Sequence, residues 1–250
     1  MNELLHGARL LLNGFGWWAV RPRVMATALI PAAIVGALMA AGLVALGAFL
    51  PAIVEALTPW ADAWAAFWAG ALRVLIGVAV LAAGVVVAVT TFTALTLLIG
   101  EPFYDRVWRS VEERRTGDVP EARYGLVRAA GDAVSLIARG LAIAVLSVAL
   151  GFVPVAGAVL AAVAGASLSG WVLADELTTR ALSARGLDGP ARRALRRASR
   201  GRVWGFGVAT HLLLMIPLAA IVTMPAAVAG STLLAHELIE RGVRPASAQD

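Results

Sequence analysis

Two arginines around a proline form the group of residues best suited to binding an anion. Pro22 fits the first position of a helix, because a proline there removes no backbone donor that the helix needs. The N–H groups of Arg23, Val24 and Met25 would then open the following helix at the positive end of its dipole. The guanidinium groups of Arg21 and Arg23 can each grip two oxygens of one anion. We predict an anion-binding site at these five positions; the alternative is that both arginines only anchor a membrane span on its inner side.

A second polar group follows the second long apolar stretch. Glu101, Asp105 and Arg109 are spaced four residues apart, so they share a helix face that Glu112 extends. One interpretation is a solvated helix face. The functional interpretation is a vestibule or gate whose carboxylates pair with arginines from segment 175–202, with Glu101 nearest the apolar boundary.

The histidine, cysteine and motif content limits the chemistry that the chain can do. His211 lies inside an apolar arm, where it either senses pH by titrating near neutrality or is hydrogen-bonded to a carbonyl oxygen. His6 and His236 are far from it in sequence and cysteine is absent, so we expect no disulfide, no metal site and no cofactor. No GxSxG, Walker or HExxH pattern occurs, so nothing favours an enzyme, and any transport would proceed without ATP.

Two uncharged stretches long enough to cross a bilayer hold these groups in place. Segments 24–50 and 74–100 carry no charge over 27 residues each, which at about 1.5 Å per residue exceeds a hydrocarbon core of about 30 Å. Arginines before the first stretch place the N-terminus in the cytoplasm and the connecting loop outside. In that loop three tryptophans recur every four residues from Trp60, which predicts an interfacial helix over 59–70 lying flat on the outer surface.

Two longer uncharged stretches, 140–174 and 203–235, are interrupted by proline. Pro154 interrupts the first, and Pro217 and Pro225 interrupt the second. The first arm of each, 140–153 and 203–216, has about 14 residues and reaches only about 21 Å, and the turns are apolar, so we predict helical hairpins that enter and leave the membrane on the cytoplasmic side. The second arm of each is nearer to spanning length. A bundle of six crossing helices is the alternative. The predicted fold class is an all-α integral membrane protein, a single domain with two long transmembrane helices, two proline-broken, hemi-penetrating hairpins and cytoplasmic helical extensions.

The cytoplasmic charge lies in segments 101–139 and 175–202. In the first, apolar residues recur at three- and four-residue steps, which predicts that the second span continues as an amphipathic helix until Gly117 and Pro120. Six arginines between 192 and 202 stand before a membrane arm, which favours anionic phospholipids over nucleic acid as their partner. All 21 basic residues are arginine, a bias typical of a GC-rich bacterial genome. We expect a multi-pass protein of the bacterial inner (plasma) membrane with both termini in the cytoplasm.

Five blocks of sequence follow one another in order along nearly the whole chain. They are Gly16, Trp17, Arg21, Pro22 and Pro31; GEPFYDRVWRSVEERRTG at 100–117; GFG at 205–207; IP at 216–217; and MPAAVAGSTLL at 224–234. In this order and spacing they resemble the CysZ-type sulfate permease family, which is grouped with the eukaryotic etoposide-induced membrane proteins. After the proline of the first block the family has glycine, an aliphatic residue and arginine, where this chain has Arg23, Val24 and Met25.

The resemblance implies two long transmembrane helices with two partly penetrating hairpins, a homo-oligomer, and passive, proton-influenced entry of sulfate for cysteine synthesis. We therefore predict an anion permease or channel that takes up sulfate or a similar oxyanion without ATP and holds it at the N-terminus of the first span. The alternative is a non-transporting membrane scaffold or adaptor, which Met25 in place of arginine favours. Two complete spans enclose a hydrated divalent anion poorly, which also favours a homo-oligomer.

Overall fold

The computed structural model describes residues 2–120 and 126–247, and the described chain is built from helices. Five stretches are long and apolar enough to cross a membrane: Pro22–Leu57, Ala66–Val89, Val134–Gly151, Gly157–Ser183 and Ala219–Gly242. The predicted class, an all-α integral membrane protein, is confirmed. The helices are α1 (Asn2–Val20), α2 (Pro22–Thr27), α3 (Ile30–Leu57), the 3₁₀ helix η1 (Pro59–Ala63), α4 (Ala66–Thr116), α5 (Leu126–Gly151), α6 (Gly157–Ser183), α7 (Gly189–Ala198), α8 (Arg200–Leu214) and α9 (Pro217–Ser247).

The chain forms two compact units. Unit 2 holds Leu29–Pro102, and unit 1 holds Met1–Ala28 together with Phe103–Asp250. Helix α4 contributes its long apolar part to unit 2 and its charged end to unit 1. The boundary between the units therefore falls inside α4, and the other helices each belong to one unit.

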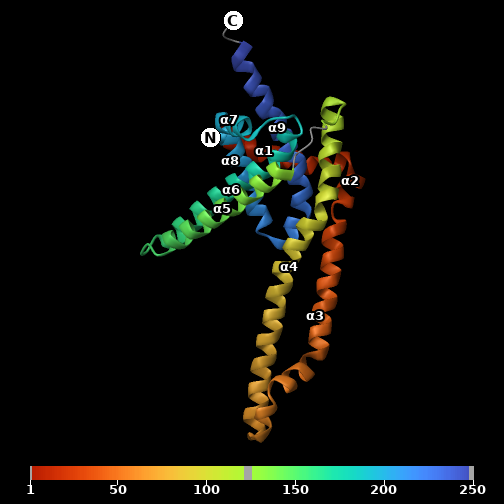
Figure 1. Cartoon of the computed structure of the whole chain (residues 1–250), viewed down its shortest axis with the longest axis vertical. Coiled ribbons are helices and arrows are strands. Elements are labelled where there is room, and N and C mark those ends of the chain that lie inside the picture. Colours follow the sequence, from red (N-terminus) through yellow and green to blue (C-terminus); the bar gives the residue numbers. More distant parts are fainter. Residues whose placement is uncertain (1, 121–125, 248–250) are drawn as a thin grey trace. The chain divides into compact units, whose positions relative to one another are not determined.

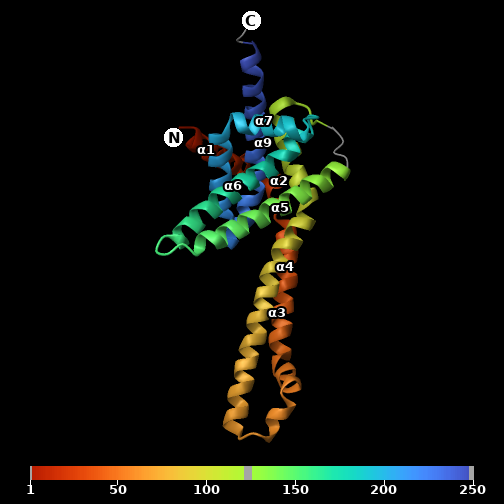
Figure 2. The same ribbon diagram turned by 60° about the vertical axis from the view of Figure 1, so that its left-hand side comes forward.

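Unit 2 is an antiparallel pair of long helices, α3 and the first part of α4 (Figure 2). The two pack closely at Gly77, where an added Cβ would lie 3.7 Å from side-chain carbons of Leu50 and Val54. Apolar side chains also cover the outward faces. Only 6% of the apolar 18-residue segment within Ala66–Val89 is buried. A surface this apolar requires hydrocarbon rather than water around it.

The connection between α3 and α4 differs from the interfacial helix predicted over 59–70. The helix η1 ends at Ala63, Trp64 is extended with φ −87° and ψ 161°, and α4 begins at Ala66. The tryptophan repeat is therefore divided between two helices and the residues that join them. Its location at the outer membrane surface stays a prediction.

A polar cluster holds this connection in a tight turn and explains why no continuous helix forms there. The buried Thr58 donates from its hydroxyl to the carbonyl oxygen of Val54 at 2.7 Å. Arg73 donates from Nε to Thr58 Oγ1 at 3.3 Å and pairs with Asp62. Because these bonds tie the end of α3 to the start of α4, they compensate for the helical hydrogen bonds that the turn gives up.

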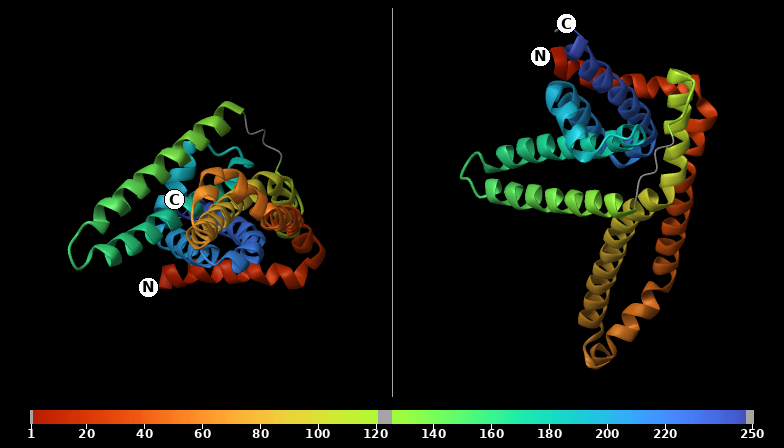
Figure 3. Two further views of the ribbon diagram at one scale, coloured as in Figure 1. Left: turned by 90° about the horizontal axis from the view of Figure 1, so that it is seen from below. Right: turned by 45° about the horizontal axis from the view of Figure 1, so that its top comes forward.

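Helices α5 and α6 form an antiparallel hairpin within unit 1 (Figures 1 and 3). Residues 152–156 connect them, and Val155 in this turn has a positive φ of 66°. Helix α5 begins at Leu126, well before the boundary expected at Gly140. Helix α5 is thus longer than the arm of about 14 residues that the sequence predicts. Its length therefore does not decide whether it enters the membrane partly or crosses it completely.

The second hairpin turns at one of its two prolines, not at both. Helix α8 has 15 residues, about 22 Å of helix, and Pro217 begins α9 after the turn. Pro225, which was also expected to interrupt this stretch, lies buried inside an unbroken α9. The apolar 18-residue segment of α9 within Ala219–Gly242 is 72% buried. Neighbouring helices therefore cover the carbonyl group that Pro225 leaves without a donor.

Glycines let the helices of unit 1 approach at backbone distance. Helix α1 packs along α8 and α9, and α6 packs along α8. An added Cβ at Gly205 would overlap the carbonyl oxygen of Leu4 in α1, and one at Gly207 would overlap that of Gly170 in α6. The GFG segment thus presents one glycine to each of two helices, at positions where any side chain would push the backbones apart.

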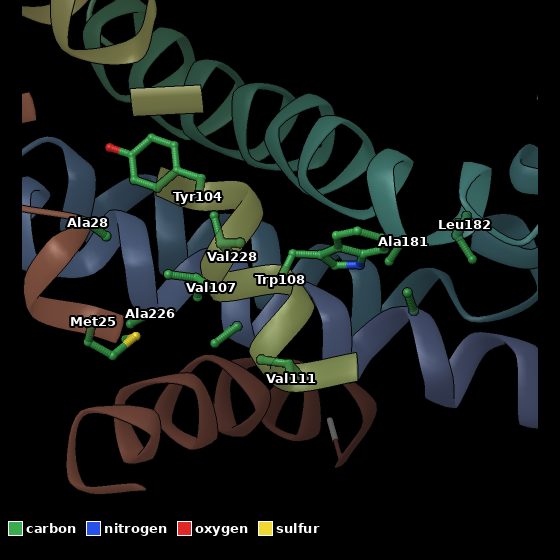
Figure 4. Packing of buried hydrophobic residues seen from close by; sticks show 12 residues of the cluster. Met25, Ala28, Tyr104, Val107, Trp108, Val111, Ala181, Leu182, Ala226 and Val228 are labelled. Carbon is green, nitrogen blue, oxygen red and sulfur yellow. The ribbon is translucent and has the colours of Figure 1, made fainter. Parts of the chain in front are cut away.

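The charged end of α4 has an apolar stripe that packs into the core of unit 1. Tyr104, Val107, Trp108 and Val111 are buried on this stripe. Figure 4 shows the Trp108 ring directed toward α6, at Ala181. The predicted amphipathic extension is confirmed, and it ends at Thr116, before Gly117 with its φ of 75°.

Candidate functional site

The five positions expected to bind an anion surround the short helix α2. Pro22 occupies the first turn of this helix, as predicted, and Arg21 is its N-cap. Arg21, Pro22 and Arg23 are exposed, whereas Val24 is half-buried. The two guanidinium groups are therefore accessible to a solute.

The backbone donors at this helix start are partly used within the chain. The N–H groups of Val24 and Met25 both donate to the carbonyl oxygen of Arg21, each at 3.1 Å. We expected the N–H groups of Arg23, Val24 and Met25 to be open to an anion. The structure corrects this, because two of the three already have an acceptor. Any anion held here would depend mainly on the arginine side chains.

The side chain of Met25 belongs to the core. It is fully buried in one cluster with Val107 of α4 and Ala226 of α9 (Figure 4). A buried thioether supplies no charge and no strong donor. Met25 therefore anchors α2 to unit 1 rather than facing a solute.

Asp105 lies between two arginines. Its Oδ2 accepts from Arg109 Nε at 2.7 Å one turn along α4, and its Oδ1 accepts from Arg180 Nη1 of α6 at 2.7 Å. The Asp105 and Arg180 side chains are 31% and 34% exposed, so water and small ions reach this pair. Glu101 is exposed on the part of α4 that belongs to unit 2.

Glu112 is the most enclosed carboxylate of the group. Its side chain is fully buried, and Arg185 binds it with both terminal nitrogens, at 3.0 Å and 2.6 Å. Trp108 Nε1 donates to Oε1 at 3.1 Å, and His236 Nε2 lies 2.9 Å from Oε2. Burial opposes ionisation most strongly, but the hydrogen bonds from His236 and Arg185 outweigh it, so the pKa of Glu112 lies below its ordinary value.

His236 Nε2 lies between Glu112 and Arg185. Nε2 is 2.9 Å from Glu112 Oε2 and 3.0 Å from Arg185 Nη2. A guanidinium can only donate and a carboxylate can only accept. Nε2 therefore satisfies Glu112 when it carries the proton, and Arg185 when it does not. The bidentate bond from Arg185 to Glu112 leaves the carboxylate paired in either case.

A further network joins the two ends of the chain within unit 1. Arg202 of α8 bonds Glu3 of α1 at 2.6 Å and also pairs with Glu237 of α9. His6 Nε2 lies 2.9 Å from Glu237 Oε2. The hydrogen bond from Arg202 is the largest influence on Glu3 and lowers the pKa of this carboxyl. Helices α1, α8 and α9 are thus linked by charge as well as by glycine contacts.

Sequence reasoning had selected the carboxylates but not all of their partners. Arg180 and Arg185 lie in segment 175–202, the segment expected to supply arginines to Asp105 and Glu112. His236 was not selected, because 124 residues separate it from Glu112 and it ends an apolar stretch without a recognisable spacing. His211 is half-buried on α8 and is absent from the networks above, and its role in sensing pH stays a prediction.

No cluster of three or more metal-ligating side chains occurs among the described residues. Comparison with curated proteins gives no match to this chain. Residues 10–225 match the protein family described as sulfate transporter CysZ/etoposide-induced protein 2.4. This match covers most of the chain and includes α2, the end of α4 and the carboxylates Glu101, Asp105 and Glu112. The chain therefore belongs to the family of the sulfate transporter CysZ and the etoposide-induced protein 2.4.

Proposed function

We propose that this chain is an anion permease or channel of the bacterial inner membrane that admits sulfate without ATP. The observation that carries the proposal is the family match over residues 10–225. The five apolar helices supply the membrane domain that such a function needs. Permeation of this kind involves binding and release and requires no catalytic group.

The anion is held first by Arg21 and Arg23 beside α2. Both side chains are exposed at the start of the chain's first apolar stretch. Guanidinium forks form paired hydrogen bonds with tetrahedral oxyanions. The double variant Arg21→Ala/Arg23→Ala should lose sulfate binding and keep its fold, as measured by calorimetry and circular dichroism in detergent. Unchanged sulfate affinity would remove this site.

Asp105 is suited to a gate because its bonds can be exchanged. It shares its carboxylate between Arg109 and Arg180, and all three side chains are about one-third to one-half exposed. An arriving oxyanion offers these arginines an acceptor of the same kind and competes with Asp105 for them. Glu112 is fully buried and bound by three side chains, so it holds this part of α4 in place while Asp105 exchanges its partners. Glu101 lies one turn before Asp105 on α4, and its role as a vestibule residue is part of the proposal.

Uptake of radiolabelled sulfate into liposomes that contain the purified chain tests the function directly. A permease gives flux above that of empty vesicles, which rises with the outside sulfate concentration and needs no nucleotide. Asp105→Asn is expected to alter the flux while sulfate binding at Arg21 and Arg23 is retained. Flux equal to that of empty vesicles would reject the proposal.

A second function, a non-transporting scaffold or adaptor, is favoured by two observations at the start of α2. Met25 is buried in the core, and the N–H groups of Val24 and Met25 are bonded to Arg21. A sulfate site at the start of α2 therefore has fewer open backbone N–H donors than the sequence predicts. The liposome measurement separates the two functions, because a scaffold gives no flux.

The permease is proposed to act as a homo-oligomer, with both termini in the cytoplasm and anionic phospholipids around its arginines. The α3 and α4 pair of unit 2 exposes apolar side chains on its outward faces and encloses no aqueous path by itself. A path for a hydrated dianion then needs further helices from unit 1 or from another copy. The particle mass in mild detergent should be a multiple of 25.9 kDa; a strictly monomeric particle would contradict this part.

A further inference from the structure

An arginine-lined cavity lies within unit 1, between α5, α6 and α7. Its volume is about 260 Å³, and five guanidinium groups and three carboxylates contribute to its lining. None of residues 21–25 and none of the carboxylates on α4 lines it. The cavity is therefore separate from the site and the gate proposed above.

Two of the arginines form the buried base of the cavity. Arg192 donates from Nη2 to Asp132 at 2.8 Å and from Nη1 to Ser183 Oγ at 2.6 Å. Arg196 lies with Nε 2.7 Å from Asp175 Oδ1. Both guanidinium groups are at least nine-tenths buried, so they are fixed in position by these acids.

A third arginine completes the pairing of Asp175. Arg139 of α5 pairs with the second oxygen of Asp175, so this carboxylate joins α5, α6 and α7. Asp132 and Asp175 are thus occupied by the arginines of the base. Glu176 is the remaining carboxylate of the lining.

The other two arginines stand exposed at the mouth. Arg193 and Arg197 line the cavity on the same helix, four residues and about 6 Å apart. Neither has a salt bridge to any residue that the structure describes. Across the whole lining, arginines outnumber carboxylates by two, and this excess is located at the mouth. The hydroxyl group of Ser135 adds an uncharged donor to the lining, whereas the Thr179 hydroxyl already donates to the carbonyl oxygen of Asp175 at 2.8 Å.

We propose that this cavity binds a tetrahedral oxyanion group, phosphate or sulfate, between Arg193 and Arg197. Two guanidinium forks one helical turn apart match the oxygens of such a group. The group belongs either to a free inorganic ion or to a phospholipid headgroup, since α5 and α6 also carry apolar stretches of membrane-spanning length. The binding site is independent of the proposed permeation function and of the site at Arg21 and Arg23.

The first test measures sulfate and phosphate binding by calorimetry on the full-length chain in detergent. It uses the Arg21→Ala/Arg23→Ala background, so that the permeation site does not contribute. Adding Arg193→Ala/Arg197→Ala should weaken binding by about tenfold or more, because two charge-assisted contacts are lost. The matched control, Arg114→Ala/Arg115→Ala, removes two exposed arginines at the end of α4 and should change the affinity by less than about twofold.

The second test places the same variants in phosphatidylcholine bilayers with and without phosphatidylglycerol and measures the phosphatidylglycerol retained per chain after extraction. A loss confined to the calorimetric test assigns the cavity to a free ion. A loss confined to retained lipid assigns it to a headgroup. Either result supports the proposal, and no effect of Arg193→Ala/Arg197→Ala in both tests overturns it.

A thiol footprint locates the bound group inside the cavity. The chain has no cysteine, so Ser135→Cys in the lining introduces a single reactive thiol. The chain is first freed of co-purified phospholipid in detergent. Added sulfate or phosphate should then slow the alkylation several-fold. If the ligand is a headgroup, added phosphatidylglycerol should slow it instead. Alkylation of Ala138→Cys, exposed on the same helix and outside the lining, should be unaffected. Equal rates at Ser135→Cys with each of these probes would contradict the location. Sulfate flux in liposomes is measured on the unaltered chain, so its failure would leave this result unchanged.

Discussion

At the scale of single residues, the fully buried Glu112 makes the sharpest prediction. Glu112→Ala removes the acceptor that Arg185 and His236 share and leaves a guanidinium largely buried without its partner. Breaking a buried pair from one side costs about 3 to 5 kcal/mol of unfolding free energy. Chemical denaturation in detergent measures this loss. Glu113→Ala, at an exposed neighbour on the same helix, should change the free energy by no more than about 0.5 kcal/mol.

The same carboxyl predicts how this stability depends on pH. Because the pKa of Glu112 is lowered from 4.5 in the folded chain, its contribution is present in full above about pH 4.5 and is lost as the pH falls through the lowered pKa. The difference in unfolding free energy between the unaltered chain and Glu112→Gln should therefore be constant near neutrality and shrink in acid. A difference that stays constant down to pH 2 would contradict the assigned ion pair.

The sequence could predict the acids of this site better than their surroundings. Asp105 and Glu112 are recognisable because each is next to a residue of an otherwise apolar stripe. Segment 175–202 is recognisable as a source of arginines. Which arginine reaches which acid depends on how α6 lies against α4, and no spacing along the chain encodes that. The same holds for Met25, whose burial follows from the packing of α2 against α4 and α9.

At the scale of the helix, the contact of α6 with α8 can be tested at Gly207. An added methyl group there would overlap the carbonyl oxygen of Gly170, and backbone cannot move aside as a flexible side chain can. Gly207→Ala should therefore lower the free energy of unfolding by about 1 to 3 kcal/mol, the usual cost of overpacking. Chemical denaturation in detergent provides the measurement.

Gly140→Ala is the matched control for this contact. Gly140 is also helical, and an added Cβ there would have no atom within 4 Å. Alanine is the better helix former, so this change should leave the stability unchanged or raise it by about 0.5 to 1 kcal/mol. Equal effects of the two substitutions would show that α6 and α8 do not approach at Gly207.

Helix boundaries were predictable where charge or glycine marks them and not where packing decides. Gly117 ends α4 as the sequence indicates, since its positive φ suits glycine. Pro217 and Pro225 look alike in sequence, yet only Pro217 begins a helix, whereas Pro225 lies buried inside the continuous α9. The tryptophan repeat from Trp60 has helical spacing, but Thr58, Asp62 and Arg73 bind one another and impose a turn.

At the scale of the whole molecule, the positions of the two hairpin turns decide the membrane topology. Two apolar turns define the question: Phe152 is 83% exposed between α5 and α6, and Met215 is 66% exposed between α8 and α9. Apolar side chains at a turn are stable in hydrocarbon and costly in water. Partly penetrating hairpins bury both turns in the membrane, whereas six crossing helices expose them to the outer solution.

Single cysteines distinguish these two topologies, because the chain itself has none. Phe152→Cys and Met215→Cys should resist a membrane-impermeant maleimide added outside intact cells, since the reactive thiolate forms in water and not in hydrocarbon. Trp60→Cys, in the connection between α3 and α4, should be labelled, and Arg114→Cys should be labelled only after the inner face is opened. Rapid outside labelling at residues 152 and 215 would establish the six-helix bundle, and the path of the anion would then have to run between complete spans.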